Sequence, residues 1–200
     1  MAQLRSTIFI DQLQPQTHAL LCSLLPGPRP RQRMAMQLID LTPSIVVERL
    51  ADQAIKYEDV GIGLAAVAAN FGFLEIHSAD PCSVKSAADA ALEAADVDSK
   101  TAPKAETLAS NHIDRVTPEQ AMVINRSNNG SAVMANEALY ILQTSPATVA
   151  LKAANEAEKA ADIKLVSCTF TGARGRVYIS GTAEAVRAAA EAAEQVIGAE

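Results

Sequence analysis

Cysteine and histidine are the residues best suited to metal binding and nucleophilic chemistry, and this chain of 200 residues contains three of each. No two cysteines stand at the C-x-x-C spacing of zinc or redox sites, and the histidines form no metal-ligand pattern with one another or with the cysteines. The six residues are Cys22, Cys82, Cys168, His18, His77 and His112. We therefore predict buried free thiols, packing or surface histidines, and no metal or other cofactor.

Sequence motifs of common enzymes are equally scarce. The chain has no G-x-S-x-G, H-E-x-x-H, P-loop or G-x-G-x-x-G sequence, and Gly61-Ile62-Gly63 is only an isolated G-x-G. We also find no paired carboxylates and no nucleophile next to a base. The sequence therefore favours a protein that is not an enzyme.

Charge and hydropathy exclude two classes of partner. The net charge is −6 with a pI near 5.1, whereas a nucleic-acid-binding face must be basic. The only dense basic run, RPRQR at 29–33, is typical of a solvated loop, with a phosphate patch as the alternative. The most apolar run, ALLCSLL, is far shorter than the ~20 residues that span a bilayer. We predict a cytoplasmic protein that binds neither nucleic acid nor membrane.

One stretch occurs twice: ADQAIKYEDV at 51–60 returns as ANEAEKAADI at 154–163. The offset of 103 residues extends over most of the chain, which indicates an internal duplication. The matched pairs include Ile10 and Ile113, Pro15 and Pro118, Gly27 and Gly130, Pro43 and Pro146, Val46 and Val149, Lys56 and Lys159, and Gly72 and Gly175.

Each copy predicts the same first elements. Buried strands at 34–41 and 138–143 are followed by a hydroxyl residue and proline, Thr42-Pro43 and Ser145-Pro146. Because Thr or Ser often caps a helix and proline suits its first position, we expect the next helix of each copy to begin there. These helices are expected over 44–57 and 147–160.

Two strands joined by a short glycine-containing turn and then a second helix complete each copy, and the final helix is expected to be capped by Thr182. A leader with one more strand and a short helix precedes each copy. This order predicts an α+β fold of two tandem ferredoxin-like domains. We place the domains at 1–98 and 111–200, with a polar linker at 99–110.

Each copy has the order strand, Thr/Ser-Pro, helix ending in A-x-x-A-x-K-x-x-D, strand, glycine-containing turn, strand and helix. This order resembles the bacterial microcompartment (BMC) shell domain. The leader IFIDQLQPQTHALLCSLLPGP resembles the N-terminal extension of circularly permuted BMC domains. Two such domains in one chain resemble the tandem shell proteins that form trimers. The resemblance implies a homotrimeric, pseudohexameric tile in a microcompartment shell, next to hexameric and pentameric tiles.

The resemblance gives the repeated lysine a role. In shell proteins a lysine near the end of the first helix lies at the tile edge and packs against its mate on a neighbouring tile. Lys56 and Lys159 match this position. The long apolar stem of lysine suits such a contact. A solvated lysine favoured by the dipole at a helix C-terminus is the alternative.

The resemblance also implies a pore. In the family, the loops between the two central strands converge on the symmetry axis, and the matching residues are Ala69, Asn70, Phe71, Gly72, Gly172, Ala173, Arg174 and Gly175. Three copies of Phe71 would then alternate with three of Arg174, and a ring of arginines would favour anionic metabolites. Alternatively, these are ordinary hairpin turns in which Gly72 and Gly175 supply a positive φ.

The sequence thus predicts a structural shell tile with a central pore for small metabolites. Two other classes stay open. One is a trimeric ferredoxin-like regulatory protein that binds a small ligand between domains. The other is an enzyme with active sites at trimer interfaces.

Overall fold

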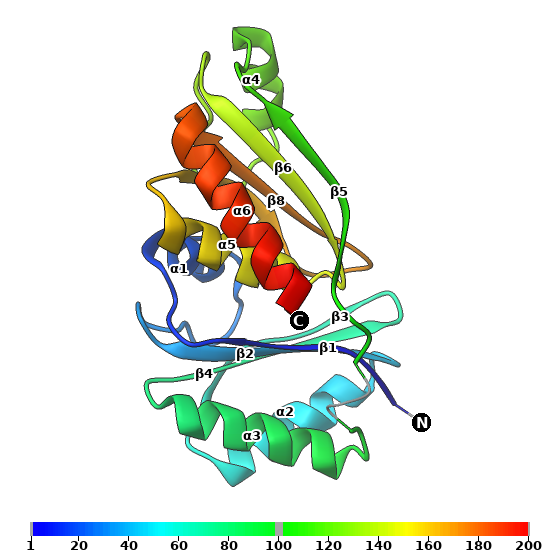
Figure 1. Ribbon diagram of the computed structural model, residues 1–200. Coiled ribbons are helices and arrows are strands. Elements are labelled where there is room, and N and C mark those ends of the chain that lie inside the picture. Colours follow the sequence, from blue (N-terminus) through cyan, green and yellow to red (C-terminus); the bar gives the residue numbers. More distant parts are fainter. Residues whose placement is uncertain (1, 99–101, 200) are drawn as a thin grey trace. The chain divides into compact units, whose positions relative to one another are not determined.

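The computed structural model describes residues 2–98 and 102–199. The chain forms two compact units, residues 1–104 with 171–173, and residues 105–170 with 174–200. Each unit contains one four-stranded antiparallel sheet (Figure 1). The predicted α+β fold and its duplication are therefore confirmed.

The first unit has the strand order β1-β2-β4-β3. Its elements are β1 (Gln3–Ile10), α1 (Pro15–Leu24), β2 (Ala35–Thr42), α2 (Val46–Tyr57), β3 (Gly61–Ala68), β4 (Phe71–Ser78) and α3 (Pro81–Ala94). Alternate strand residues such as Ile39 and Leu74 face α2 and α3, where Ala54 and Ala87 are fully buried. Small alanine side chains let both helices lie close to the sheet.

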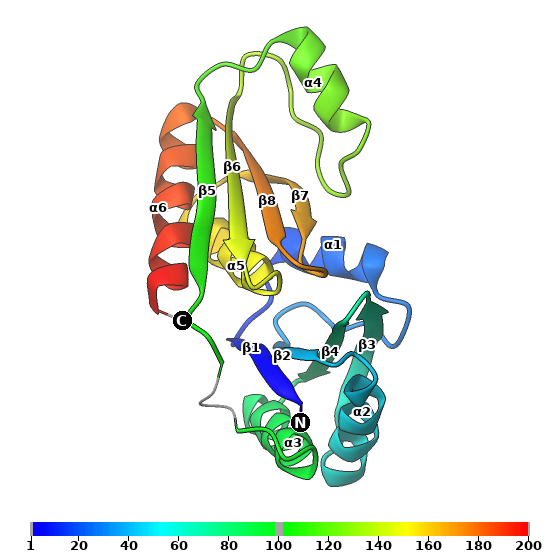
Figure 2. The same cartoon turned by 90° about the vertical axis from the view of Figure 1, so that its right-hand side faces the viewer.

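The second unit repeats this plan with the order β5-β6-β8-β7. Its elements are β5 (Glu106–Ile113), α4 (Pro118–Asn125), β6 (Ala138–Ser145), α5 (Val149–Ala160), β7 (Lys164–Thr169), β8 (Gly175–Gly181) and α6 (Ala183–Ala199). Figure 2 shows α4 on one face of this sheet and α5 with α6 on the other. Ala121 on α4 packs with Leu139 and Tyr178, whereas Tyr140 points to α6 and donates a hydrogen bond to Glu194.

The two copies agree in detail. Pro15 and Pro118 both begin the leader helix, and Val46 and Val149 both begin the next helix. The backbone N–H of Gly27 donates to the carbonyl of Gly63 at 3.0 Å, and that of Gly130 donates to Val166 at 3.0 Å. An added Cβ at either glycine would lie within 2.6 Å of a β3 or β7 carbonyl oxygen. This close approach explains why both copies have glycine.

The predicted caps at Thr42 and Ser145 are wrong. β2 extends to Thr42 and β6 extends to Ser145. The peptide bonds Thr42-Pro43 and Ser145-Pro146 are cis. The next helices, α2 and α5, begin only at Val46 and Val149. The residues between strand and helix form a turn in which Pro43 accepts a hydrogen bond from the N–H of Val46. The predicted cap of α6 is confirmed, because Thr182 Oγ1 accepts from the N–H of Ala185 at 3.2 Å.

The predicted linker at 99–110 overlaps a strand. Residues 99–101 lie outside the described residues, but 106–110 belong to β5 because they pair with β6, with Ala109 opposite Gln143 and Ser110 opposite Leu142. Both leader strands are edge strands of their sheets. No helix in the described ranges is long and apolar enough to cross a membrane.

Candidate functional site

The first predicted pore loop is a tight hairpin between β3 and β4. Ala68 pairs with Phe71, so Ala69 and Asn70 form the turn, with Ala69 at a φ of 54°. Both turn residues are exposed, and Phe71 is half-buried. The amide of Asn70 donates to Thr42 Oγ1 at 2.8 Å, which ties the turn to the end of β2.

Arg5 on β1 holds this hairpin and the tip of the second loop. Its Cζ lies 3.8 Å from the centroid of the Phe71 ring, a cation–π contact. Its guanidinium also donates to the carbonyls of Gly172 at 3.3 Å and Ala173 at 3.1 Å, in the segment of the second loop that belongs to the first compact unit. Arg5 therefore brings residues from both predicted pore loops together.

Asp40 on β2 is the counter-ion of Arg5. Nη1 of Arg5 donates to both carboxylate oxygens of Asp40, at 2.8 and 3.0 Å, and the Asp40 side chain has no exposed area. Burial raises the pKa of Asp40 to about 7, although the charge and hydrogen bonds of Arg5 act in the opposite direction. The site thus contains a carboxyl group that titrates near neutral pH.

The second predicted loop joins β7 to β8. Phe170 before it is buried, Gly172 adopts a φ of 101°, and Ala173 and Arg174 are exposed. The positive φ expected at Gly72 and Gly175 occurs instead at Ala69 and Gly172.

Gly72 and Gly175 have a different role. An added Cβ would lie 2.8 Å from the Ser44 oxygen at Gly72 and 2.3 Å from the Ala147 oxygen at Gly175. Both glycines therefore let the hairpin start directly against the turn that precedes α2 or α5.

Lys56 and Lys159 both lie in the last turn of their helices, α2 and α5. Lys56 pairs with Asp52 at 2.7 Å and its side chain is 67% exposed, whereas Lys159 pairs with Glu156 at 2.9 Å and is 28% exposed. The two large apolar neighbours of Lys56, Ile55 and Tyr57, are also exposed. The lysines are thus on the surface, and Lys56 stands in an apolar patch.

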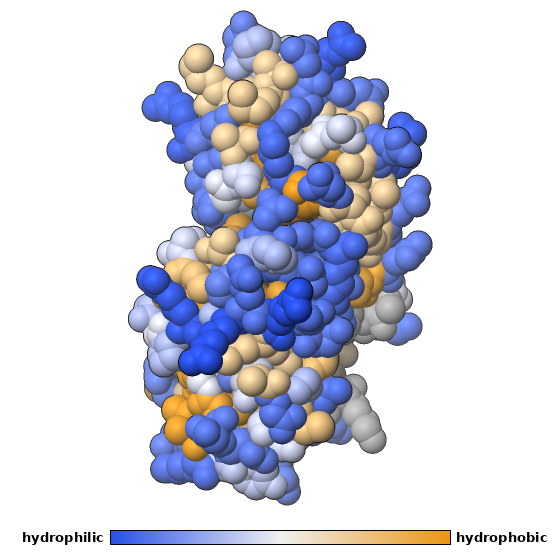
Figure 3. All heavy atoms as spheres, turned by 90° about the vertical axis from the view of Figure 1, so that its left-hand side faces the viewer, coloured by the Kyte–Doolittle hydropathy of each residue, from blue (hydrophilic) through white to orange (hydrophobic). Residues whose placement is uncertain are grey.

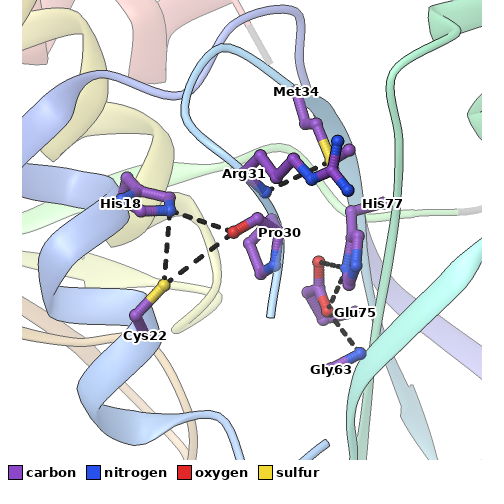
Figure 4. Close-up of polar contacts among 8 residues, drawn as sticks. All are labelled: His18, Cys22, Pro30, Arg31, Met34, Gly63, Glu75 and His77. Atoms are coloured by element: carbon purple, nitrogen blue, oxygen red, sulfur yellow. Dashed lines mark hydrogen bonds and ion pairs between the residues drawn. The ribbon is translucent and has the colours of Figure 1, made fainter. Parts of the chain in front are cut away.

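Each histidine contacts another residue of the fold, and His77 alone is buried. His18 Nε2 lies 2.9 Å from the carbonyl oxygen of Pro30, and Nδ1 of His77 contacts Glu75, which also accepts from the N–H of Gly63 (Figure 4). His112 is exposed, and its ring is tilted by 40° to that of Tyr140 with the centroids 4.5 Å apart. Within the described residues, no group of His, Cys, Asp and Glu is arranged to hold a metal ion.

All three thiols are free, but only one is buried. Cys168 is buried, Cys22 is half-buried and Cys82, in the first turn of α3, is exposed. The prediction of buried thiols is therefore right for Cys168 and wrong for Cys82, because the first turn of α3 presents Cys82 to solvent. The basic run at 29–33 lies in a loop between α1 and β2, and its three arginines are exposed as predicted.

Sequence reasoning missed the Arg5–Asp40 pair. The available signal was Asp40 itself, an acidic residue inside the apolar strand MAMQLIDL. A buried charge needs a partner, but the sequence alone does not say that the partner lies on β1.

Comparison with known families agrees with this fold. Residues 4–101 match the CsoS1D N-terminal domain, and residues 138–200 match the BMC domain. The chain is 34% identical over 196 residues to the carboxysome shell protein CsoS1D of Prochlorococcus marinus, covering 98% of this chain and 77% of that protein. It is 32% identical over 202 residues to the carboxysome shell protein CcmP of Synechococcus elongatus, covering 99% and 95%.

Solved structures give the same result. The fused permuted hexameric shell protein MSM0275 from the RMM microcompartment is 44% identical, with 98% of each chain covered and a TM-score of 0.93. The double-ringed trimeric shell protein MSM0271 from the same microcompartment is 28% identical, with 100% of this chain and 98% of that chain covered and a TM-score of 0.94. With two permuted copies of one domain and similarity over nearly its whole length, the chain belongs to the tandem-domain bacterial microcompartment shell proteins, the family of CsoS1D and CcmP.

Proposed function

We propose that three copies of this chain form a pseudohexagonal tile in the facet of a microcompartment shell, with a pore on the three-fold axis. The observation that carries the proposal is the duplication, because three chains with two equivalent domains supply the six domains that a hexagonal outline needs. The resemblance of the whole chain to a fused permuted hexameric shell protein supports it. The role is structural rather than catalytic.

The pore of this tile is lined by the two hairpin loops. Phe71, Ala69, Asn70 and Gly72 from the first domain alternate around the axis with Gly172, Ala173, Arg174 and Gly175 from the second. The exposure of Asn70 and Arg174 and the contacts of Arg5 with both loops support this assignment. A ring of three exposed arginines attracts anions, so the pore favours small anionic metabolites.

Tile edges carry Lys56 and Lys159. On the face shown in Figure 3, hydrophilic residues predominate and apolar residues lie in small groups. The exposed Ile55 and Tyr57 beside Lys56 form an apolar patch at the end of α2, and this patch is suited to contact with a neighbouring tile. The partners at these edges are copies of this tile and other tiles of the shell, both hexameric and pentameric.

Electron microscopy of the purified protein with averaged top views tests the proposal. We expect flat discs with three-fold symmetry and a near-hexagonal outline, or sheets of such discs. Native mass alone does not discriminate, because a regulatory ferredoxin-like protein can also be a trimer. Compact particles without a flat hexagonal face contradict the tile and favour that regulatory class, which a ligand screen would then address.

A further inference from the structure

The second unit contains a polar hollow of about 300 Å³ on the α4 side of its sheet. The polar residues that line it are Ser127, Asn128, Ser167, Thr169, Arg176 and Tyr178, with Val123 and Ile124 of α4 as its apolar wall. None of the lining residues is acidic. Its volume is at the lower end of the range for small-molecule sites, about 300–1,000 Å³.

Strand pairing places four of these side chains next to one another on one face of the sheet. Ser167 pairs with Tyr178, and Thr169 pairs with Arg176, across β7 and β8. Since residues two apart on a strand point to the same face, the two hydroxyls, the phenol and the guanidinium converge on the hollow. The segment after α4 closes the other side, where the side chain of Asn129 makes two 3.0 Å hydrogen bonds with the backbone of Cys168.

The equivalent place in the first unit shows what packing alone requires. At the offset of 103 residues, Arg176 corresponds to Phe73, Ser167 to Leu64, and Thr169 to Ala66. Ser127 and Asn128 likewise correspond to Leu24 and Leu25. Phe73 is 1% exposed and Leu25 is 4% exposed, whereas the remaining strand residue, Tyr178, corresponds to Glu75, which is buried and accepts from the N–H of Gly63. Polar residues at the positions of Ser127, Asn128, Ser167, Thr169 and Arg176 thus occur only in the second unit.

Among the described residues, Arg176 has no partner for its charge. Across the described ranges, the side chains of Ser167, Thr169, Arg176 and Tyr178 make no hydrogen bond or ion pair. A guanidinium offers a planar fork of donors that matches carboxylate and phosphate oxygens. The surrounding hydroxyl and amide groups are able to bind hydroxyls of the same ligand.

We propose that this hollow is a binding site for a small hydroxylated organic anion, a carboxylate or phosphate ester of metabolite size, with Arg176 bound to the anionic group. Thr169 and Arg176 pair at the base of the second hairpin loop, but none of the lining residues is among those assigned to the pore, so the proposal holds whether or not the loops form a pore.

Isothermal titration calorimetry of the assembled protein tests this with three probes. Glycerol 3-phosphate and lactate each carry an anionic group and a hydroxyl, whereas glycerol supplies hydroxyls alone. We expect saturable binding of at least one anion and none of glycerol over the same concentration range. Binding of glycerol as tight as that of the anions, or no saturable binding of any probe, overturns the proposal.

Three variants localise the binding. Arg176→Gln should weaken binding of the anion by roughly tenfold or more, because it removes a charge-assisted pair. Arg176→Phe restores the residue of the first unit and should abolish binding. The matched control Arg187→Gln removes an exposed arginine on α6 and should leave affinity unchanged. Unchanged affinity in Arg176→Gln, in a protein of unaltered size by gel filtration, places the anion elsewhere and contradicts the assignment.

Discussion

The guanidinium of Arg5 lies 3.8 Å above the ring of Phe71 while it pairs with the buried carboxyl of Asp40. These residues belong to three different strands, β1, β4 and β2. The first hairpin loop is thus held by a charged residue whose partner titrates near neutral pH. This arrangement has a consequence for stability.

Asp40 should contribute more to the stability of the protein in mild acid than at neutral pH. Its folded pKa of about 7 is above the ordinary aspartate value of 3.8, so the folded chain binds more protons than the unfolded chain between these values. The contribution of Asp40 to the free energy of unfolding therefore falls as pH rises from about 4 to 7 and is constant above that. Thermal midpoints of the protein and of Asp40→Asn at pH 5, 6, 7 and 8 measure this contribution.

The difference between the two midpoints should change with pH up to 7 and then level off. Asp89→Asn, at an exposed position on α3, controls for the loss of one negative charge. An Asp40→Asn variant whose midpoint follows that of the parent protein at every pH contradicts the assignment.

Alanine at either hairpin glycine should destabilise the chain. In Gly72→Ala and Gly175→Ala the new Cβ meets backbone oxygen atoms, which cannot move away as a flexible side chain can. We expect a loss of about 1–3 kcal/mol in each case, typical of overpacking. Gly198→Ala on α6 is the control, since nothing lies within 4 Å of its added Cβ. Urea unfolding gives the comparison, and equal midpoints for all three variants would refute the steric explanation.

The three cysteines should react with thiol reagents in a fixed order. Cys82 is exposed and should be modified first, followed by the half-buried Cys22. Burial raises the pKa of Cys168 to about 12, so this thiol is protonated at pH 8 and also inaccessible. Iodoacetamide labelling at pH 8 followed by peptide mass spectrometry reports the order. Modification of Cys168 without prior unfolding would show that the second unit opens readily.

Alanine at the edge lysines should abolish sheets and leave single tiles intact. Lys56→Ala and Lys159→Ala remove only exposed or half-exposed ion pairs, worth about 0–1 kcal/mol to the fold. Electron microscopy should show discs of unchanged outline that no longer associate laterally. Lys104→Ala removes another exposed lysine and should still give sheets. Sheets in both edge variants would mean that the lysines are simply solvated.

The internal duplication of the sequence allowed much of the fold to be predicted. Pro15 with Pro118 and Gly27 with Gly130 occupy equivalent places because each copy meets the same local constraint, a helix start or a close backbone approach. Hydrophobic patterns and turn residues are local as well, so strand and helix order followed from them. The prediction of helix caps at Thr42 and Ser145 was wrong because β2 and β6 continue through these residues.

Long-range contacts required the tertiary structure. Arg5 and Asp40 are 35 residues apart, and nothing local in either segment specifies their pairing, which follows from the antiparallel β1–β2 register. The hollow beside Arg176 was likewise visible in the sequence only as substitutions between copies, Phe73 by Arg176 and Leu64 by Ser167. Whether such a substitution fills space or leaves it open depends on how β7, β8 and α4 pack. The sequence alone determined that one domain is duplicated, because local patterns specify its helices, strands and turns and occur in both copies. Tertiary packing decided which polar residues contact one another, such as Arg5 and Asp40.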